Sequence, residues 1–497
     1  MNRSPSQSSP PSPSSVLDDL LAALAPAPRA AAQRALVLLI QGLDPDAALD
    51  VPHIDRHLVE LDRRLFAQLD AILHHPAVQS LEAAWRSLDV LMDRIRFDEN
   101  IRVEILPCSK QDLLDDLASA PEVTRSGLYF HVYAQAIGTF GGKPYGLLAA
   151  DFDFTPSAED IALLRHCAAV AAIAHAPFIT NASPTFLGQD DYAGLPRLRD
   201  LHAALAGPRF RLWHAFRATE DARYVGLCLP RVLLRAPYDV DTDPLAPLPY
   251  RETCRHHRDF LWGRPSYLFV ATAAASFARH RWCVHILGTR AATPTAAGAL
   301  FWDYPTLPGL WHRIPFECQV TARLAHLLAD EGLIALVYER ASARAVLLAA
   351  PSAQRPRAFR GDGDTVNEHL GAQLSYVFLV SRLAHYLKCV QRERIGQWID
   401  RSGLERDLEN WLRNYISDQP DAQWEVRARR PLRRAAVFVE PVEGQAGWYR
   451  CRLQLQPHLT HNSASFTLAL VGKLDRPTGE APKNTTLGAS LLAGPRG

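Results

Sequence analysis

Apolar residues recur at helical spacing near the N-terminus and predict two consecutive helices between residues 54 and 96. Pro76 marks the start of the second helix, because proline is favoured in a first helical turn. The first helix has an apolar stripe formed by Ile54, Leu58, Leu61, Leu65 and Leu69. The second repeats the pattern with Val78, Leu81, Trp85, Leu88 and Leu91. Such a stripe faces a core or a partner, so each helix is expected to pack along one side.

A shorter apolar pattern lies upstream, after a leader that is rich in serine and proline. Residues 1–15 have nothing apolar to bury and are predicted to be disordered. Ser15 can cap a short helix over residues 16–25, which Pro26 ends. One face of this helix carries Leu17, Leu20, Leu21 and Leu24. A helix of this length is marginal alone in water, so its leucine face requires a partner.

The centre of the chain combines a glycine-rich turn, a buried strand and a buried helix. Four glycines between Gly138 and Gly146 precede the apolar run 145–150, which predicts a short buried strand that Asp151 and Asp153 close. Ser157, with an aspartate three residues later, begins a helix as a capping-box-like pair. Further strands are predicted at 101–106 and 333–338, and helices at 109–117, 264–280 and 321–331. Residues 101–400 are therefore assigned to a central α/β core.

The C-terminal third changes from helical to strand periodicity. Residues 366–399 give the longest helical pattern and are apolar on most sides in the middle, as in a buried helix. Ser402 and Glu405 form a second capping box, and the helix that follows turns its charged residues outward: Glu405, Arg406, Asp407, Glu409 and Arg413. Period-two alternation over 435–474 predicts an antiparallel ribbon with Leu453, Leu455, Phe466, Leu468 and Leu470 on apolar positions. Residues 476–497 are predicted to be a disordered tail.

Composition and charge narrow the functional class. The 497 residues carry 54 Lys plus Arg and 53 Asp plus Glu, a net charge of +1, which argues against a dominant nucleic-acid or membrane-surface role. No apolar run reaches the roughly 18 residues that a membrane span requires. The eight cysteines form no Cys-x-x-Cys pair and suit reduced thiols. A cytoplasmic protein with about three domains is therefore expected.

Several patterns could carry chemistry, and each has an ordinary structural alternative. A phosphate loop needs Gly-Lys followed by Ser or Thr, but Pro144 follows Lys143 here. Asp151 and Asp153 share a strand face without a third metal ligand in view. Cys254, with two histidines close by, lacks a partner pair at zinc spacing. His385 reads as a hydrogen-bonded core histidine. No catalytic, cofactor or metal residue is assigned, and a hydrolase or nucleotide-dependent enzyme using the Gly138–Gly146 loop is the alternative.

A collinear set of short segments resembles the large subunit of the contractile sheath of type VI secretion systems, the TssC or VipB family. The segments are 72–76, 81–88, 138–154, 172–178, 224–231, 261–263, 381–388 and 394–396. They occur in the family's order, and the resemblance covers about residues 60–475. At 289–293 this chain departs from a glycine cluster of the family, which leaves the loop at 288–308 open.

The resemblance implies a mixed α/β and α+β fold, with an N-terminal helical region (16–100), the central core and a C-terminal helix and β ribbon (401–475). It also implies a structural, non-enzymatic role without a cofactor. The implied partners are a small sheath subunit (TssB/VipA-like), further copies of this chain in a helical polymer, an inner tube hexamer, a baseplate and an AAA+ unfoldase. A relative of phage tail sheaths that assembles alone is a further possibility.

The resemblance also suggests roles for four sets of residues. Ile54, Leu58, Leu61 and Leu65 would contact the small subunit. Leu17, Leu20, Leu21 and Leu24 would form a handle for the unfoldase. Glu405, Asp407, Glu409 and Arg413 would face the inner tube. Leu453, Leu455, Phe466, Leu468 and Leu470 would exchange strands with neighbouring subunits.

Overall fold

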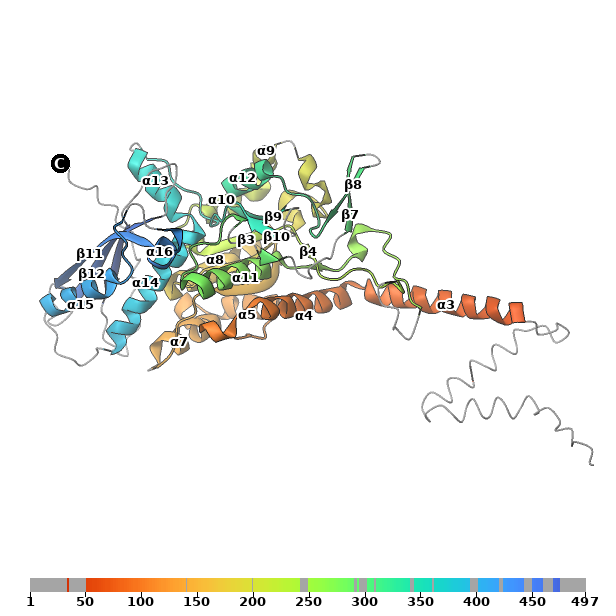
Figure 1. Ribbon diagram of the computed structural model, residues 1–497, viewed down its shortest axis with the longest axis horizontal. Helices are drawn as coiled ribbons and strands as arrows, with labels where there is room; N and C mark the ends of the chain where they lie inside the picture. Colours follow the sequence, from red (N-terminus) through yellow and green to blue (C-terminus); the bar gives the residue numbers. More distant parts are fainter. Residues whose placement is uncertain are drawn as a thin grey trace, which may run out of the picture. The chain divides into compact units, whose positions relative to one another are not determined.

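A computed structural model describes Arg34 and residues 51–139, 141–198, 200–241, 249–289, 293–294, 302–307, 310–339, 344–359, 362–393, 401–419, 423–441, 449–458 and 468–473. The chain divides into two units, residues 1–71 and residues 72–497. Most of α3 (Val51–Leu73) lies in the first unit. The second unit holds all of the sheets (Figure 1).

The second unit is built around a six-stranded mixed sheet in the order β1-β2-β3-β9-β10-β6. Four neighbours run parallel: β1 (Leu148–Phe154), β2 (Phe178–Ala182), β3 (Val225–Leu229) and β9 (Leu333–Glu339). The strands β10 (Arg344–Leu347) and β6 (Thr293–Pro294) complete the sheet in antiparallel pairings. Parallel strands are covered on both faces, which explains why β2, β3 and the first half of β9 are buried throughout.

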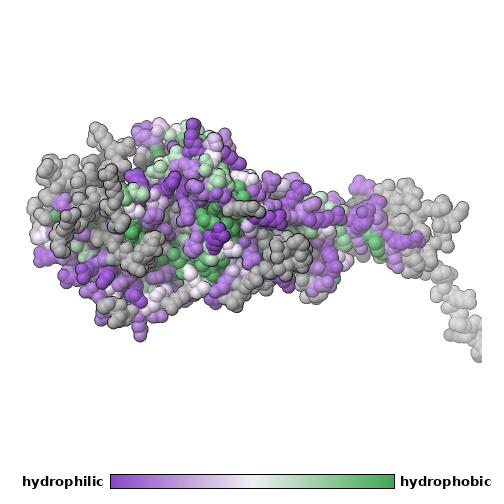
Figure 2. All heavy atoms as spheres, turned by 90° about the horizontal axis from the view of Figure 1, so that it is seen from above, coloured by the Kyte–Doolittle hydropathy of each residue, from purple (hydrophilic) through white to green (hydrophobic). Residues whose placement is uncertain are grey.

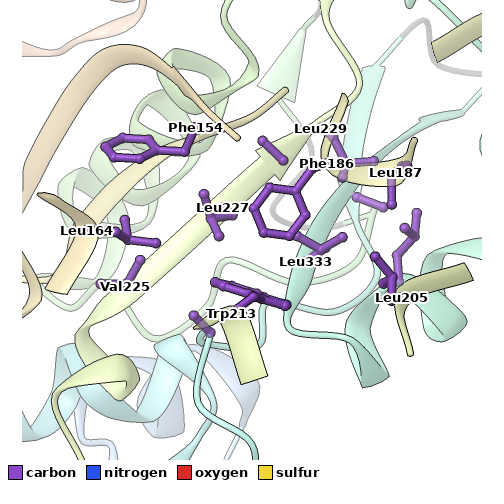
Figure 3. Close-up of a cluster of buried hydrophobic side chains, with 14 of the residues drawn as sticks. Phe154, Leu164, Phe186, Leu187, Leu205, Trp213, Val225, Leu227, Leu229 and Leu333 are labelled. Atoms are coloured by element: carbon purple, nitrogen blue, oxygen red, sulfur yellow. The ribbon is translucent and has the colours of Figure 1, made fainter. Parts of the chain in front are cut away.

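Helices cover both faces of this sheet. Alternate residues of β3 point to different cores: Leu227 packs with α8 (Ala158–Ala174) and α10 (Arg211–Arg217), whereas Cys228 packs with α11 (Pro265–His280) and α14 (Leu374–Glu393). Helix α12 (Ala322–Asp330) belongs to the first face and α4 (Pro76–Arg94) to the second. In the first core the Phe186 ring lies edge-on to Trp213, with ring centroids 4.9 Å apart, beside Leu227 (Figure 3).

Gly226 lets α14 approach the middle of the sheet. A Cβ at this position would lie 2.9 Å from the Cδ1 atoms of Ile179, Ile334 and Leu374. These contacts are closer than side-chain carbons tolerate, so the strand requires glycine here.

The C-terminal part forms a second sheet, in the order β11-β12-β13. The antiparallel strands are β11 (Leu432–Pro441), β12 (Tyr449–Pro457) and β13 (Leu468–Lys473). Leu383 and Leu387 of α14 and Leu408 of α15 (Arg401–Arg413) pack on its apolar face. Helix α14 therefore contributes to the cores of both sheets, and Figure 1 shows it beside α15 and β11–β12.

The remaining elements are short connections. They are α5 (Lys110–Ser119), α6 (Gly127–Tyr129), a π-helical turn (Phe130–Ala134), α7 (Gln135–Gly138), α9 (Leu201–Leu205), β4 (Val232–Leu233), β5 (Trp262–Gly263), β7 (Trp302–Leu307), β8 (Leu310–Ile314), α13 (Asp362–Gly371) and α16 (Trp424–Arg429).

Much of the predicted local structure is confirmed. The helix pair before residue 96 is present as α3 and α4, and the helices predicted at 109–117, 264–280 and 321–331 are α5, α11 and α12. Ser157 caps α8 by accepting a hydrogen bond from the Asp160 backbone N–H, 3.2 Å. The fold class, a mixed α/β and α+β protein with a C-terminal antiparallel ribbon, is also confirmed.

Four local predictions are wrong. The central strand is Leu148–Phe154, so Asp151 and Asp153 lie inside it and do not close it. Residues 101–106 form no strand, because Ile101 and Val103 pack on α4 and α11 without a neighbouring ladder. Ser402 lies within α15 and does not precede it.

The fourth error is the uninterrupted helix predicted over 366–399, of which residues 394–399 lie outside the described part. The helix is interrupted between α13 and α14. There the Ser352 N–H donates to Ala372 O at 2.7 Å, and the Leu374 N–H donates to Ala350 O at 2.9 Å. This non-local pairing replaces the helical hydrogen bonds.

Candidate functional surfaces

Helix α3 presents leucines to solvent. Leu58, Leu61 and Leu65 are 53%, 49% and 41% exposed and share one face at helical spacing. The side chain of Ile54, the first member of the predicted stripe, lies outside the described part. A row of half-exposed leucines is a feature of helices that have a partner.

A second apolar face is exposed on α4. The predicted stripe was expected to pack along one side, but Leu81 and Trp85 are 63% and 65% exposed. The side of α4 that packs on α11 is instead formed by Ala83, Ser87 and Leu91. Small residues allow this close approach. Of the predicted stripe, Leu88 and Leu91 pack with residues of α11, whereas Leu81 and Trp85 face solvent. On the face shown in Figure 2, hydrophilic residues cover most of the coloured surface and hydrophobic ones gather in smaller patches.

Helix α15 separates its apolar and charged sides as expected. Leu404, Leu408 and Leu412 are buried against the C-terminal sheet. On the other side, Asp407 and Arg413 are exposed, and Glu405 and Glu409 are half-buried. The described part therefore offers a mixed-charge strip above the sheet.

The residues predicted for strand exchange occupy different positions. Leu453 and Leu455 lie in β12, which is paired on both sides, and both are fully buried. Leu468 and Leu470 lie in β13, whose outer side has no paired strand among the described residues. Phe466 and the predicted turn at 443–447 lie outside the described part. Only β11 and β13 can therefore offer an edge of this sheet.

The glycine-rich stretch binds an arginine of its own chain. Arg392 Nη1 donates to the carbonyl oxygens of Ile137, Thr139 and Gly142 at 3.0, 3.1 and 2.9 Å. A phosphate loop instead presents backbone N–H groups to its ligand. The described residues of the loop thus present carbonyl oxygens, which are hydrogen-bond acceptors, to α14. This arrangement favours a structural contact over a phosphate-binding site. Sequence reasoning missed Arg392, because it lies about 250 residues downstream.

The two aspartates of β1 are also held internally. Arg264 Nε lies 3.3 Å from Asp151 Oδ1, and its Nη1 bonds to Asp153. Burial raises the pKa of Asp151 to about 6. The guanidinium therefore takes the position that a metal would need, and it ties β1 to the start of α11.

His385 and Lys388 of α14 donate hydrogen bonds to the carboxyl end of α8. His385 Nε2 donates to Ala174 O at 2.7 Å, and Lys388 Nζ donates to Ile173 O at 3.0 Å. Both carbonyls belong to the last turn of α8, which has no intrahelical donors for them, so side-chain donors are favourable there. The hydrogen-bonded core histidine predicted at position 385 is confirmed, and the segment 381–388 serves to join α14 to α8.

Cys254 and the two histidines that follow it, His256 and His257, form no metal-binding group among the described residues. Cys254 lies instead near His74 and Glu252, with ligand atoms within 4.8 Å of one another. Both Glu252 oxygens are already engaged by Arg235, at 2.5 and 3.2 Å. A guanidinium next to the carboxylate opposes a cation there. This cluster therefore acts as an ion pair between the β4 region and the 249–254 loop.

Within the described part, no helix is long and apolar enough to cross a bilayer. The eight cysteines all lie in the described part and form no disulfide there. The predicted unfoldase handle, residues 16–25, lies outside the described residues.

Comparison with known proteins places the chain in a class and then in a family. Two family models together cover most of it, which defines a tail sheath protein: residues 55–354 match "EvpB/VC_A0108, tail sheath N-terminal domain", and residues 363–474 match "EvpB/VC_A0108, tail sheath gpW/gp25-like domain". The type VI secretion system sheath protein TssC1 of Pseudomonas aeruginosa is 34% identical over 430 residues, which are 85% of this chain and 86% of that protein. The chain belongs to the TssC/VipB family of type VI secretion system sheath proteins.

A structural comparison gives a weaker likeness. A chain in the cryo-EM structure of the anti-feeding prophage baseplate has 11% identity and a TM-score of 0.31, with 78% of this chain and 83% of that chain covered. A score this low supports no argument about fold or function.

Proposed function

We propose that this chain is the large subunit of a contractile sheath that polymerises with a small sheath subunit around an inner tube and propels the tube by contracting. Family membership over residues 55–474 supports this role. An open helical polymer requires heterologous contacts, in which different surfaces of identical subunits meet. Contraction would be a switch between two packings of that lattice. The role is structural and cytoplasmic, without catalysis, and a baseplate anchors one end of the polymer.

The exposed leucine face of α3 supports the proposed contact with the small sheath subunit. Leu58, Leu61 and Leu65, together with Ile54, form the contact that the partner covers. Half-exposed leucines on one helical face are unfavourable in water and favourable in an interface. Leu81 and Trp85 form a second surface of the same kind, and an exposed tryptophan is a typical hot-spot residue.

Co-expression with the product of the neighbouring gene tests this pairing. We expect the two proteins to elute together at a fixed stoichiometry in size-exclusion chromatography with light scattering. A chain that elutes alone and monodisperse, while its neighbour is expressed and soluble, would contradict the proposal.

The charged strip of α15 is proposed to face the inner tube. Glu405, Asp407, Glu409 and Arg413 are polar and accessible enough to make weak contacts that release during contraction. Residues 401–475 would then form the inner wall, and residues 101–400 the body of the subunit.

The open edge of β13 is proposed to pair with a strand of a neighbouring subunit. An unpaired edge is a template for another chain, and backbone hydrogen bonds would link subunits that must rotate without separating. Leu453 and Leu455 support this sheet from its core, while Leu468 and Leu470, with Phe466, supply the exchanging segment. The edge accounts for one contact of the lattice.

Proline substitutions at Leu468 and Ala469 of β13, made one at a time, test this pairing. N–H groups of adjacent strand residues point to opposite sides, so one of the two variants removes a donor of the open edge. We expect that variant to form a soluble complex with the small subunit but no sheath. Normal cylinders with both variants would rule out strand pairing at β13.

The leader helix is proposed as the unfoldase handle. Leu17, Leu20, Leu21 and Leu24 would be covered in one state of the lattice and accessible in the other. Deletion of residues 1–25 should leave assembly intact and block disassembly by the AAA+ unfoldase. Disassembly at the normal rate after this deletion would refute the assignment.

A further inference from the structure

A cavity lies between the end of α11 and the start of α16, away from the surfaces described above. Its volume is about 280 Å³, and Arg279, His280, His285, Leu287, Thr289 and Trp424 line it. Hydrogen bonds hold two of the segments that surround it. Gly288 donates its N–H to Leu347 O of β10 at 2.9 Å, and Trp282 Nε1 donates to Arg429 O at the end of α16 at 3.1 Å. The cavity is therefore a built feature of the fold.

The cavity has a positive lining. Arg279 and His280 occupy the last turn of α11. No carboxylate is among the described residues that line it. Outside it, Arg427, Arg429 and Arg430 are exposed along and just after α16. Opposing charge comes from Glu425, which also lies near His280. The local field thus favours an anion.

Two imidazoles lie against the cavity, and one of their nitrogens has no hydrogen-bond partner. His280 is 9% exposed, and the His285 Nε2 atom is buried without a partner. Their rings contact each other with centroids 5.5 Å apart, and each contacts the Trp424 ring, at 4.9 and 5.3 Å. Buried polar atoms are normally satisfied, so an unpartnered imidazole nitrogen beside a cavity points to a ligand.

We propose that this cavity binds one carboxylate or sulfate- or phosphate-like oxyanion, held by Arg279, His280 and His285 with Trp424 as an apolar wall. A guanidinium and two protonated imidazoles supply charge-assisted donors for the oxygens of such a group. The volume accommodates a single acidic group. The anion comes either from solution or from an acidic side chain of a neighbouring subunit in the sheath.

Binding at this site depends on pH. Burial, with the charge of His280, lowers the pKa of His285 to about 4, and burial, with the charges of Arg279 and Arg429, lowers the pKa of His280. A bound anion favours the protonated imidazoles and raises both pKa values. Affinity is therefore greatest below the pKa values of the empty site, and it falls as pH rises through the higher values of the occupied site.

Sulfate is the probe of choice, because its charge is constant over the pH range of interest. We expect isothermal titration calorimetry at constant ionic strength to detect saturable sulfate binding to the full-length chain at about pH 5.5 and about tenfold weaker binding near pH 7.5. Arg279→Gln should weaken binding at least about tenfold, because it removes a charge-assisted donor. Arg323→Gln on α12, which removes an exposed charge elsewhere, should change it less than about twofold.

A second variant protects the test against misfolding. His285→Gln replaces the imidazole by a neutral, polar amide that cannot become cationic, so we expect weaker pH dependence with an unchanged melting temperature. The proposal is overturned if the wild-type chain binds no sulfate near the lower pH, or if the Arg279 and Arg323 variants bind it equally.

Assembly with the small subunit distinguishes the two sources of the anion. If the ligand is a side chain of a neighbour, Arg279→Gln slows sheath formation and sulfate inhibits the wild type. If the ligand is a free anion, sulfate binds and assembly is unaffected. Sulfate binding is measured independently of assembly, so failure of the sheath proposal would leave the binding result intact.

Discussion

Replacing leucines of the α3 face by aspartate should abolish binding of the small subunit. Leu58, Leu61 and Leu65 have exposed fractions of 53%, 49% and 41%, which together amount to roughly one and a half leucine side chains. Covering a whole leucine contributes about 1.5–3 kcal/mol, so covering this face contributes about 2–4 kcal/mol. This corresponds to a change in Kd on the order of 100-fold.

The double variant Leu58→Asp with Leu65→Asp removes most of this term and adds two charges that an apolar interface would have to desolvate. The expected increase in Kd is therefore at least about 100-fold, enough to abolish co-purification at micromolar concentrations. Since both side chains are half-exposed on α3, the change should leave the sheets intact. Circular dichroism and the melting temperature of the variant check this.

Ala67→Asp is the matched control for Leu65→Asp. It adds the same charge to the same helix at an exposed position, but two residues correspond to about 200° of rotation and place it on the opposite face. We expect the control to bind the small subunit with a Kd within about threefold of the wild type. Equal binding by the wild type, the control and the double variant in a pull-down titration would refute the role of the α3 face.

Three further predictions concern the core and the inner wall. Gly226→Ala should lower the free energy of unfolding by about 1–3 kcal/mol, because its Cβ would crowd three side chains, whereas Gly207→Ala meets open space and should leave the melting temperature unchanged. Burial alone would raise the pKa of Glu317, but its ion-pair partner Arg231 lowers this pKa to about 2. The pair therefore stabilises the fold above about pH 4.5, and its contribution is lost as the pH falls towards 2. Glu317→Gln should lower the free energy of unfolding by about 3–5 kcal/mol at neutral pH and flatten this part of the acid-unfolding curve. Glu405→Lys with Glu409→Lys should slow tube-dependent polymerisation severalfold at low salt and less at high salt, and unchanged light-scattering kinetics would count against contact with the tube.

Local patterns were sufficient for elements whose stabilisation is local. The Ser157 cap identified the start of α8, and the apolar residues that follow it at helical spacing, Ile161, Leu164 and Ala168, are buried. Period-two alternation likewise identified Leu453 and Leu455 as core residues of the ribbon.

Non-local contacts account for what the patterns could not predict. Asp151 and Asp153 read as the end of a strand because their arginine partner, Arg264, is more than 100 residues away. The break between α13 and α14 depends on hydrogen bonds to residues 350–352. Hydrophobicity placed Leu81 and Trp85 in a packing stripe, yet the close approach of α11 selects the small residues Ala83 and Ser87. In each case the deciding partner is distant in sequence.

Negative-stain electron microscopy of the co-expressed chain and its neighbouring gene product tests the central claim most directly. The sheath assignment predicts long hollow cylinders that contain both proteins and that are absent when the double α3 variant replaces the wild-type chain. A well-behaved soluble complex that never forms cylinders, with or without the inner tube protein, would contradict it.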